Sequence, residues 1–410
     1  MDVVYRRCAG MDVHKETVAV CLVKSDGGEA SKEVRTFGTM TRDLLALSDW
    51  LDQQEVTHVA MESTGVFWKP IFNILEGRFQ VLLVNARHIK QVPGRKTDVK
   101  DCEWIADLLR HGLLKASFVP ERPQRELRDL TRHRAQLAGE RTRVANRIQK
   151  VLEDANIKLA SVATDVLGVS GREMIQALLE GDQDPSQMAA LARGRMRSKK
   201  DALEAALEGR VTEHHRFMLR TLWDHLTYLE QAIQAMDQRI EERMRPFEAE
   251  RKRLDAIPGV DRIVAQAVLA EIGVDMSRFP TADHLASWAG VCPGNNRSAG
   301  KRKSGQTAKA NRWLKRCLSQ AAWAASHTKD TYLSAQFRQI AKRRGRKRAI
   351  IAVAHTILIA AYHILRGAEY RELGGDSFDR LHPERLQHYY VRRLQKLGFE
   401  VWLTKPPAAA

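Results

Sequence analysis

The stretch CAGMDVHK, residues 8–15, places one carboxylate, Asp12, inside an apolar run that predicts a buried strand. The stretch VAMEST, residues 59–64, repeats the pattern, because Glu62 ends an apolar run that predicts a second strand. An unpaired carboxylate inside such a run is costly to bury, so each of these side chains needs a cationic partner. The two strands would carry both carboxylates to one end of a sheet.

A third acidic segment, KTDVKD at residues 96–101, carries Asp98 and Asp101 three residues apart at a predicted helix start, so they share one face. Helix capping by Thr97 and Asp98 is the alternative, and it explains this pair but not the two strand carboxylates. Convergence of all four would suit a pair of Mg²⁺ ions, or Mn²⁺ in their place, in phosphodiester chemistry. The expected metal-binding and catalytic carboxylates are Asp12, Glu62, Asp98 and Asp101.

Composition favours a polyanionic partner. The 410 residues include 67 lysines and arginines against 50 acidic residues, a formal net charge of +17. Each neutralised phosphate of a nucleic acid releases counterions, so this surplus favours binding to DNA or RNA. A hydrophobic content of 44% is that of a folded protein and excludes wholesale disorder.

Membrane association is the competing explanation for the charge. Residues 1–10 carry two arginines, and no apolar stretch of a signal peptide follows them. The apolar run Ala349–Leu365 is short for a membrane span and contains two histidines, so we expect a buried helix and no membrane partner. The five cysteines are scattered without a CxxC pair, which predicts neither a zinc site nor disulfides and fits a reducing cytoplasm.

Strand and helix patterns alternate up to about Val119, which predicts a mixed α/β sheet of the ribonuclease H type. The strand ends are where such a sheet would place catalytic carboxylates. The expected strands are Cys8–Val23, Glu33–Thr39, Val56–Glu62 and Phe79–Val84, with a turn at residues 25–28, and the expected helices are Arg42–Gln53, Phe67–Leu75 and Val99–His111.

Two long helices follow, Gln124–Lys158 and Phe217–Lys252, because apolar side chains recur in them every seven residues. Two uses of these apolar lines are equally favoured: a helical hairpin within one chain, or a coiled coil that joins two chains. Residues 161–209 between them are less regular and suggest an insertion of short helices. The repeating side chains are Leu130, Leu137, Val144 and Val151 in the first helix, and Leu219, Leu226, Ile233, Ile240 and Phe247 in the second.

The C-terminal part begins with Ile257-Pro258-Gly259-Val260 ahead of a predicted helix, Arg262–Ile272. This pattern is typical of a helix-hairpin-helix element, whose backbone N–H groups at the glycine can approach a phosphate, and a plain turn between helices is the alternative. Beyond Leu381 the tail is polar and basic, and we expect loose packing there.

Residues 290–316 combine a glycine-rich loop, two serines and a dense group of cations. A serine hydroxyl is a poor nucleophile until a base or metal activates it, so spacing alone favours a phosphate-binding loop in which the serines donate hydrogen bonds. The expected nucleic-acid contacts, which include the basic loop before Asp98, are Arg95, Lys96, Gly259, Lys301, Arg302, Lys303, Lys309, Arg312, Lys315 and Arg316.

Five segments resemble, in matching order from about Gly10 to Leu381, the DEDD-type insertion-sequence transposases. They are CAGMDVHK, AMESTGV, KTDVKDCEWIADLLRHGLL, IPGVDRIVAQAVLAEIG and WAGVCPGNNRSAGKRKSG. The resemblance implies a RuvC-like, RNase H-like domain at 1–122, a helical coiled-coil region with an insertion at 123–253, a helical C-terminal transposase domain with a helix-hairpin-helix element at 254–382, and a basic tail at 383–410.

The resemblance also assigns roles to residues. The family's acidic quartet maps onto Asp12, Glu62, Asp98 and Asp101. Its nucleophilic serine maps onto Ser298, with Ser304 as the second choice. Arg297 stands before Ser298, where the resemblance leads us to expect an acidic residue.

The function implied is that of a bacterial, nucleoid-associated recombinase that excises and inserts a mobile element. It would act on donor and target DNA, be guided by a structured bridge RNA, and exchange strands with Mg²⁺ through a covalent phosphoserine. The resemblance further implies a homodimer at each DNA and a tetramer when two DNAs are joined.

Two alternatives remain open from the residues. One is a RuvC-like junction-resolving or RNase H-like nuclease that uses the same carboxylates with water as the nucleophile. The other is a catalytically silent nucleic-acid-binding protein that uses the basic runs Lys301–Arg316 and Lys342–Arg348.

Overall fold

The computed structural model describes residues 2–25, 30–63, 65–86, 89, 101–182, 184–293, 296–298, 301–304, 306–307, 310–381 and 383–404. The chain divides into two compact units, Met1–Pro120 and Glu121–Ala410. The predicted boundaries after residues 253 and 382 lie within the second unit, and the four-domain division stays a prediction.

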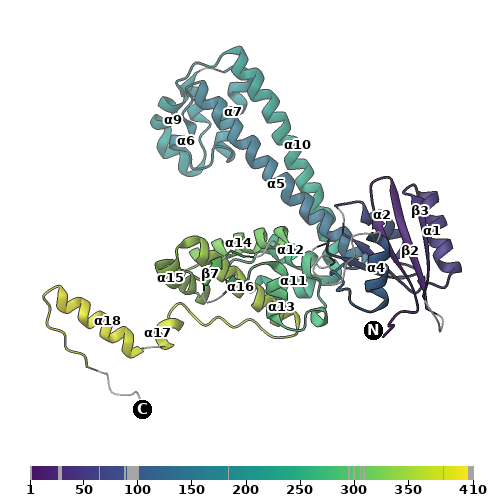
Figure 1. Ribbon diagram of the computed structural model, residues 1–410. Helices are drawn as coiled ribbons and strands as arrows, with labels where there is room; N and C mark the ends of the chain where they lie inside the picture. The colour runs from purple at the N-terminus through teal and green to yellow at the C-terminus, as the bar shows by residue number, and fades with distance from the viewer. Residues whose placement is uncertain are drawn as a thin grey trace. The chain divides into compact units, whose positions relative to one another are not determined.

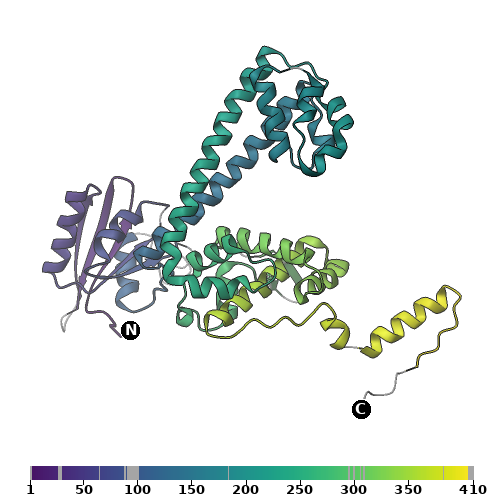
Figure 2. The same cartoon turned by 180° about the vertical axis from the view of Figure 1, so that it is seen from behind.

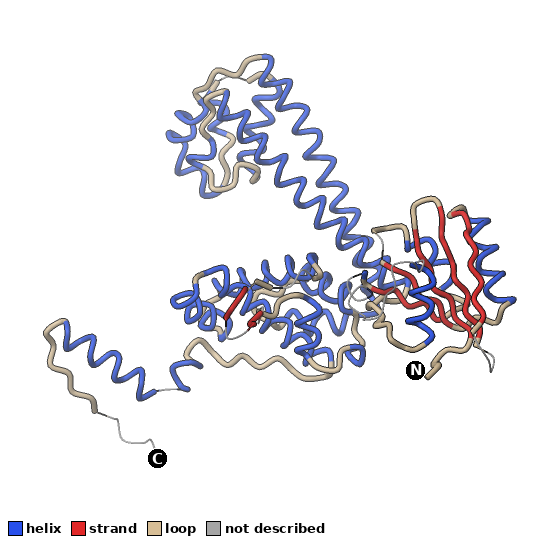
Figure 3. Tube along the Cα trace, in the orientation of Figure 1, coloured by secondary structure: helices blue, strands red, loops and turns tan. Residues whose placement is uncertain are grey.

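The first unit is built on one five-stranded mixed sheet with the order β3-β2-β1-β4-β5, shown in red in Figure 3. β1 pairs antiparallel with β2, and β2 with β3, whereas β1, β4 and β5 run parallel. The predicted mixed α/β sheet is therefore confirmed, and it is consistent with a RuvC-like domain. The strands are β1 Arg7–Val13, β2 Thr17–Lys24, β3 Ser31–Gly38, β4 His58–Glu62 and β5 Gln80–Val84.

One strand prediction was wrong. The run Cys8–Val23 forms two strands, because the polar residues 14–16 interrupt it and the N–H of His14 donates to the carbonyl of Thr17 in a tight turn. Asp12 therefore lies next to this turn, near the end of β1, and pairs across the sheet with Ala19.

Helices cover both faces of the sheet (Figures 1 and 2). α1 (Thr41–Gln53) and α2 (Trp68–Leu75) pack on the face that carries Met11 and Met61. α4 (Asp101–Arg110) packs on the opposite face over Gly10, so closely that a Cβ at Gly10 would lie 2.2 Å from the backbone nitrogen of Ala106. Only glycine permits this approach of a helix backbone to the central strand.

The second unit contains a long helical hairpin. α5 (Arg122–Asp154) and α10 (Glu213–Met244) run side by side and antiparallel, as Figure 2 shows. Apolar side chains fill the seam, and ion pairs Arg134–Asp237 (2.6 Å) and Arg141–Glu230 (2.8 Å) flank it. Of the two uses left open by the seven-residue repeats, the chain thus adopts the intrachain hairpin.

The far end of this hairpin holds its own apolar core, formed with the segment between the two helices. That segment consists of short helices, as the irregular sequence suggested. They are α6 Leu159–Val162, α7 Val169–Glu180, α8 Pro185–Ala190, the 3₁₀ helix η1 Gly194–Lys199 and α9 Lys200–Leu207.

The predicted helix Phe217–Lys252 was too long. α10 ends at Met244 and a 3₁₀ turn, η2 (Arg245–Phe247), follows, because Pro246 has no N–H to continue the helical hydrogen bonds.

The basic tail also differs from expectation, since it contains a helix. The remaining elements are α11 Glu248–Asp255, α12 Arg262–Ile272, η3 Met276–Arg278, α13 Ala282–Ala289, β6 Asn296–Ser298, β7 Lys301–Ser304, α14 Arg312–His327, α15 Tyr332–Arg344, α16 Arg346–Leu365, α17 Ser377–Leu381 and α18 Pro383–Lys396.

α16 is the one helix in the described part of the chain that is long and apolar enough to cross a membrane. It packs against α11, α13, α14 and α15, and its buried side chains include Val353 and Leu358. The hydroxyl of Tyr362 donates to the carbonyl of Phe279 at 3.0 Å. These contacts are those of a core helix, as its length predicted.

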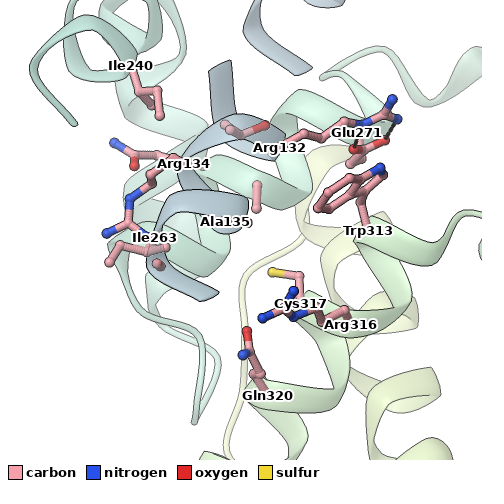
Figure 4. A pocket seen from close by; sticks show the side chains of 14 residues that line it. Arg132, Arg134, Ala135, Ile240, Ile263, Glu271, Trp313, Arg316, Cys317 and Gln320 are labelled. Atoms are coloured by element: carbon pink, nitrogen blue, oxygen red, sulfur yellow. Dashed lines mark hydrogen bonds and ion pairs between the residues drawn. The ribbon is translucent and has the colours of Figure 1, made fainter. Parts of the chain in front are cut away.

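A buried carboxylate joins the hairpin to the C-terminal helices of the same unit. Glu271 on α12 is 2% exposed and accepts two hydrogen bonds from Arg132 of α5, at 2.7 and 2.8 Å (Figure 4). Arg128 lies 3.6 Å from the same carboxylate and donates to the carbonyl of Ala270. Burial lowers the pKa of Arg128 to about 10, and the negative charge of Glu271 opposes that shift.

The fourth member of this network is Asn311. Its side-chain amide donates to Glu271 at 2.6 Å, and its side-chain oxygen caps α14 by accepting from the N–H groups of Trp313 and Leu314. The same carboxylate therefore fixes α5, α12 and the start of α14.

The close contact at Gly10 can be tested by adding one methyl group. Gly10→Ala should destabilise the first unit by about 3 kcal/mol, because the new Cβ would meet backbone atoms that cannot move aside. Gly77→Ala is the matched control, since a Cβ there meets nothing within 4 Å. Thermal unfolding of both variants measures the effect, and an unchanged transition in Gly10→Ala would show that α4 does not pack on β1 this closely.

The Glu271 network predicts a second stability effect. Glu271→Ala should lower the free energy of unfolding by about 3–5 kcal/mol, because it leaves buried arginine unpaired. The control is Glu242→Ala, which removes a half-exposed pair with Arg239 and should cost at most about 1 kcal/mol. Urea unfolding compares the two, and equal losses would refute a special role for the buried carboxylate.

Candidate active site

Asp12 and Glu62 occupy the same level on two adjacent parallel strands. The strand register pairs Met11 of β1 with Met61 of β4, and each acidic residue comes one position later. Neighbouring strands lie about 4.8 Å apart, and side chains alternate between faces. Both carboxylates therefore belong to the face that carries Gly10 and α4.

The start of α4 lies at the same end of the sheet. Gly10 lies against Cys102 and Ala106, whereas the carbonyl of Arg110, at the other end of α4, accepts from Val4. The helix thus begins near the level of Asp12 and runs back along β1. Burial raises the pKa of the Cys102 thiol, and the negative charges of Glu103 and Asp12 raise it further.

Asp101 is the first residue of α4, where the helix dipole favours a carboxylate. The strand register and the start of α4 therefore place the backbone of Asp12, Glu62 and Asp101 at the same end of the sheet. Asp98 lies outside the described residues. Within the part of the chain that is described, no three His, Cys, Asp or Glu side chains form a group that could hold a metal ion, so the predicted metal site stays a prediction.

Asp12 already has one partner. Its carboxylate lies 3.1 Å from the Nε2 atom of His14, which is mostly exposed, and the Asp12 side chain is 24% exposed. A partly exposed carboxylate with a titratable neighbour at the end of a strand is accessible to an incoming cation or substrate.

Ser298 is the last residue of β6. Its backbone pairs with that of Lys301, the first residue of β7, in a two-stranded antiparallel hairpin. Ser304, the second choice, ends β7 opposite Asn296. The side chains of residues 296–298 and 302–304 lie outside the described part, so the structure places the backbone of the serine and an exposed Lys301 beside it.

Three of the predicted nucleic-acid contacts lie on the first turns of α14. The guanidinium of Arg312 lies 4.8 Å over the ring of Trp313, and Lys315 donates to the hydroxyl of Thr307. Arg316 is exposed. The predicted residues Arg95, Lys96 and Lys309 lie outside the described residues, as do the side chains of Arg302 and Lys303.

Gly259 has a structural reason to be glycine. Its φ is +83°, and a Cβ there would lie 2.3 Å from the carbonyl oxygen of Ala321 and 2.6 Å from the nitrogen of Ala325. The turn between α11 and α12 therefore packs on the backbone of α14. Its predicted contact with a phosphate stays a prediction.

Glu271 was not among the predicted site residues, although the sequence around it indicates a buried carboxylate. Glu271 lies in the apolar run IVAQAVLAEIG, and an acidic residue in such a run needs a partner for the same reason as Asp12 and Glu62. Its partners Arg132 and Asn311 are 139 and 40 residues away, and no local pattern identifies them.

Two family models match this chain. One, for DEDD-type IS110 transposases and described as Transposase, covers residues 9–157. The other, described as Transposase IS116/IS110/IS902 family, covers residues 251–338. The first includes the sheet, α4 and the positions of all four predicted carboxylates, and the second includes the serine hairpin and α14.

Curated relatives include three proteins of insertion elements. The IS110 uncharacterized 43.6 kDa protein of Streptomyces coelicolor is 28% identical over 68% of this chain and 73% of its own length. The IS900 uncharacterized 42 kDa protein of Mycobacterium paratuberculosis is 28% identical over 87% of this chain and 95% of its own. The IS116 uncharacterized 44.8 kDa protein of Streptomyces clavuligerus is 26% identical over 52% and 60%.

The matched segments lie in the order of the five motifs, and they cover both the carboxylate edge and the serine hairpin. A transposase family implies DNA as the substrate. The chain belongs to the DEDD-type insertion-sequence transposases.

Proposed function

We propose that this protein is an RNA-guided DNA transposase that exchanges strands through a covalent phosphoserine, with Mg²⁺ at the carboxylate edge. The observation that carries the proposal is the shared level of Asp12 and Glu62 on adjacent parallel strands, with α4 beginning at Asp101 over the same face. Carboxylates at this end of the sheet would offer the oxygen ligands that Mg²⁺ prefers, which supports the proposal.

Ser298 is the proposed nucleophile. Its Oγ atom attacks a DNA phosphorus, so that a serine O–P bond forms as the bond to the leaving DNA oxygen breaks, and that oxygen takes up a proton. A hydroxyl of the second DNA strand then attacks the phosphoserine and returns the serine. Bound at Asp12, Glu62, Asp98 and Asp101, two Mg²⁺ ions would stabilise the charge that develops on the oxygens.

Cations on the second unit support a role in holding the nucleic acid. Lys301 is exposed beside Ser298, and Arg312 and Arg316 are exposed on α14. Such side chains stabilise the extra negative charge of a phosphorus under attack and position the strand through its phosphates. A guide RNA would supply sequence choice by pairing with donor and target DNA.

A dimer or tetramer is part of the proposal, and the hairpin limits how it could form. The apolar positions of α5 and α10 are already buried against each other within one chain. A second copy would therefore have to use side chains outside that seam, such as the exposed Phe217 or Tyr228 of α10.

The serine mechanism predicts a covalent protein–DNA adduct. Purified protein, its candidate guide RNA, Mg²⁺ and labelled donor and target duplexes should give an adduct on a denaturing gel. Ser298→Ala and Asp101→Ala should each abolish it, because one removes the nucleophile and the other a metal ligand. Ser304→Ala serves as the matched control and should retain the adduct.

Two results would contradict the proposal. If the protein cleaves DNA without forming an adduct, and the cleavage persists in Ser298→Ala, then water is the nucleophile. An adduct that persists in EDTA and in Asp101→Ala would remove the metal from the reaction.

A further inference from the structure

The second unit contains a cavity of about 180 Å³ that the proposed chemistry leaves without a role. It lies among α5, α10, α12 and α14, and Figure 4 shows its side chains arranged around a central space. Pockets for drug-sized ligands are typically about 300–1,000 Å³, so this one suits a smaller group such as a single planar ring system.

One wall of the cavity is an aromatic ring. Trp313 is half-buried on the first turn of α14, and Arg312 lies over its ring. Small side chains on α5 and α12, namely Ala135, Ala138 and Ala267, leave the space beside it open. An indole of this kind is a platform on which a base of a nucleic acid can stack.

The charges around the cavity favour an anionic strand. Glu271, the one carboxylate among the described residues that line it, is neutralised by Arg132, and Arg134 is paired with Asp237. Arg316 lines the cavity, is exposed, and makes no ion pair within the described part of the chain. A phosphate at its rim would therefore meet an uncompensated positive charge.

Amide groups provide hydrogen-bonding partners for a base edge. Gln320 is exposed on α14 two turns beyond Trp313, and it makes no hydrogen bond within the described residues. Gln266 of α12 is buried and lies 3.4 Å from Glu241. Glutamine can both donate to and accept from the edge of an unpaired base.

We propose that this cavity binds one unpaired nucleobase, stacked on Trp313, with the adjoining phosphate held by Arg316. The proposal deepens the proposed function and rests on it, because it concerns a protein that handles nucleic-acid strands. Strand exchange leaves bases unpaired, and α14 begins eight residues after the end of the hairpin that carries Ser298 and Ser304. Bases of DNA and of RNA share the required chemistry.

The test compares binding of two short fluorescent duplexes that differ by a single-nucleotide bulge, prepared both as DNA and as RNA, in the absence of Mg²⁺. The wild-type protein should bind the bulged duplex more tightly than the paired one. Trp313→Ala and Ala135→Leu, which remove the platform and fill the space, should each weaken binding of the bulged duplex about tenfold, the scale of one stacked base. Neither should change binding of the paired duplex.

Matched controls lie on the same helix. Trp323→Ala and Ala324→Leu change the same residue types at exposed positions of α14 outside the cavity, and they should leave both affinities unchanged. Arg316→Ala should weaken both duplexes, because a phosphate contact does not depend on pairing. Melting temperatures close to that of the wild type would show that the variants fold.

The outcomes are separable from those of the adduct experiment. Two results would overturn the base-binding cavity even if the Ser298-dependent adduct forms. In one, the wild-type protein binds the bulged and the paired duplex with equal affinity. In the other, Trp313→Ala and Ala135→Leu weaken binding of both duplexes equally. A preference for the bulged RNA or for the bulged DNA supports the cavity and identifies which strand supplies the base. Loss of the adduct mechanism with an intact bulge preference would overturn the proposed function alone.

Discussion

Glu271 can be buried at 2% exposure only because Arg132, Arg128 and Asn311 surround it. Buried ion pairs do not by themselves make a protein more stable than well-packed apolar residues would, but a broken pair is costly. The network therefore acts mainly as a constraint on geometry. It fixes the position of α12 and of the start of α14 against α5. Because Trp313, Arg312 and Arg316 lie at the start of α14, their positions beside the cavity are fixed as well.

A comparable constraint shapes the first unit. Because Gly10 has no side chain, the backbone of α4 packs directly against the backbone of β1, and this contact sets where α4 begins. Because the helix starts at the level of Asp12, a residue near position 101 joins the strand carboxylates at one edge of the sheet. In both units one residue that does not itself react in the proposed chemistry fixes the helix that carries the side chains proposed to bind or react.

Much of the fold was predictable from the sequence because the patterns are local. The helix Arg262–Ile272 was predicted to the residue, since the capping residue Asp261 and the glycine Gly273 mark its ends. The strand Cys8–Val23 was mispredicted because its two apolar halves were given more weight than the polar residues 14–16 between them, which form the turn. The helix through Phe247 failed because apolar spacing was given more weight than Pro246.

The sequence by itself determined the family and the mixed sheet followed by helices, because these depend on residue types at short spacings, and from the same spacings it predicted the acidic and serine positions. Tertiary structure decided that the seven-residue repeats of α5 and α10 pair within one chain, since either partner would satisfy the same apolar lines. It also decided which residues neutralise Glu271 and that α5, α10, α12 and α14 enclose a cavity. Such contacts join residues far apart in the chain, and their energies depend on three-dimensional packing that no local pattern records.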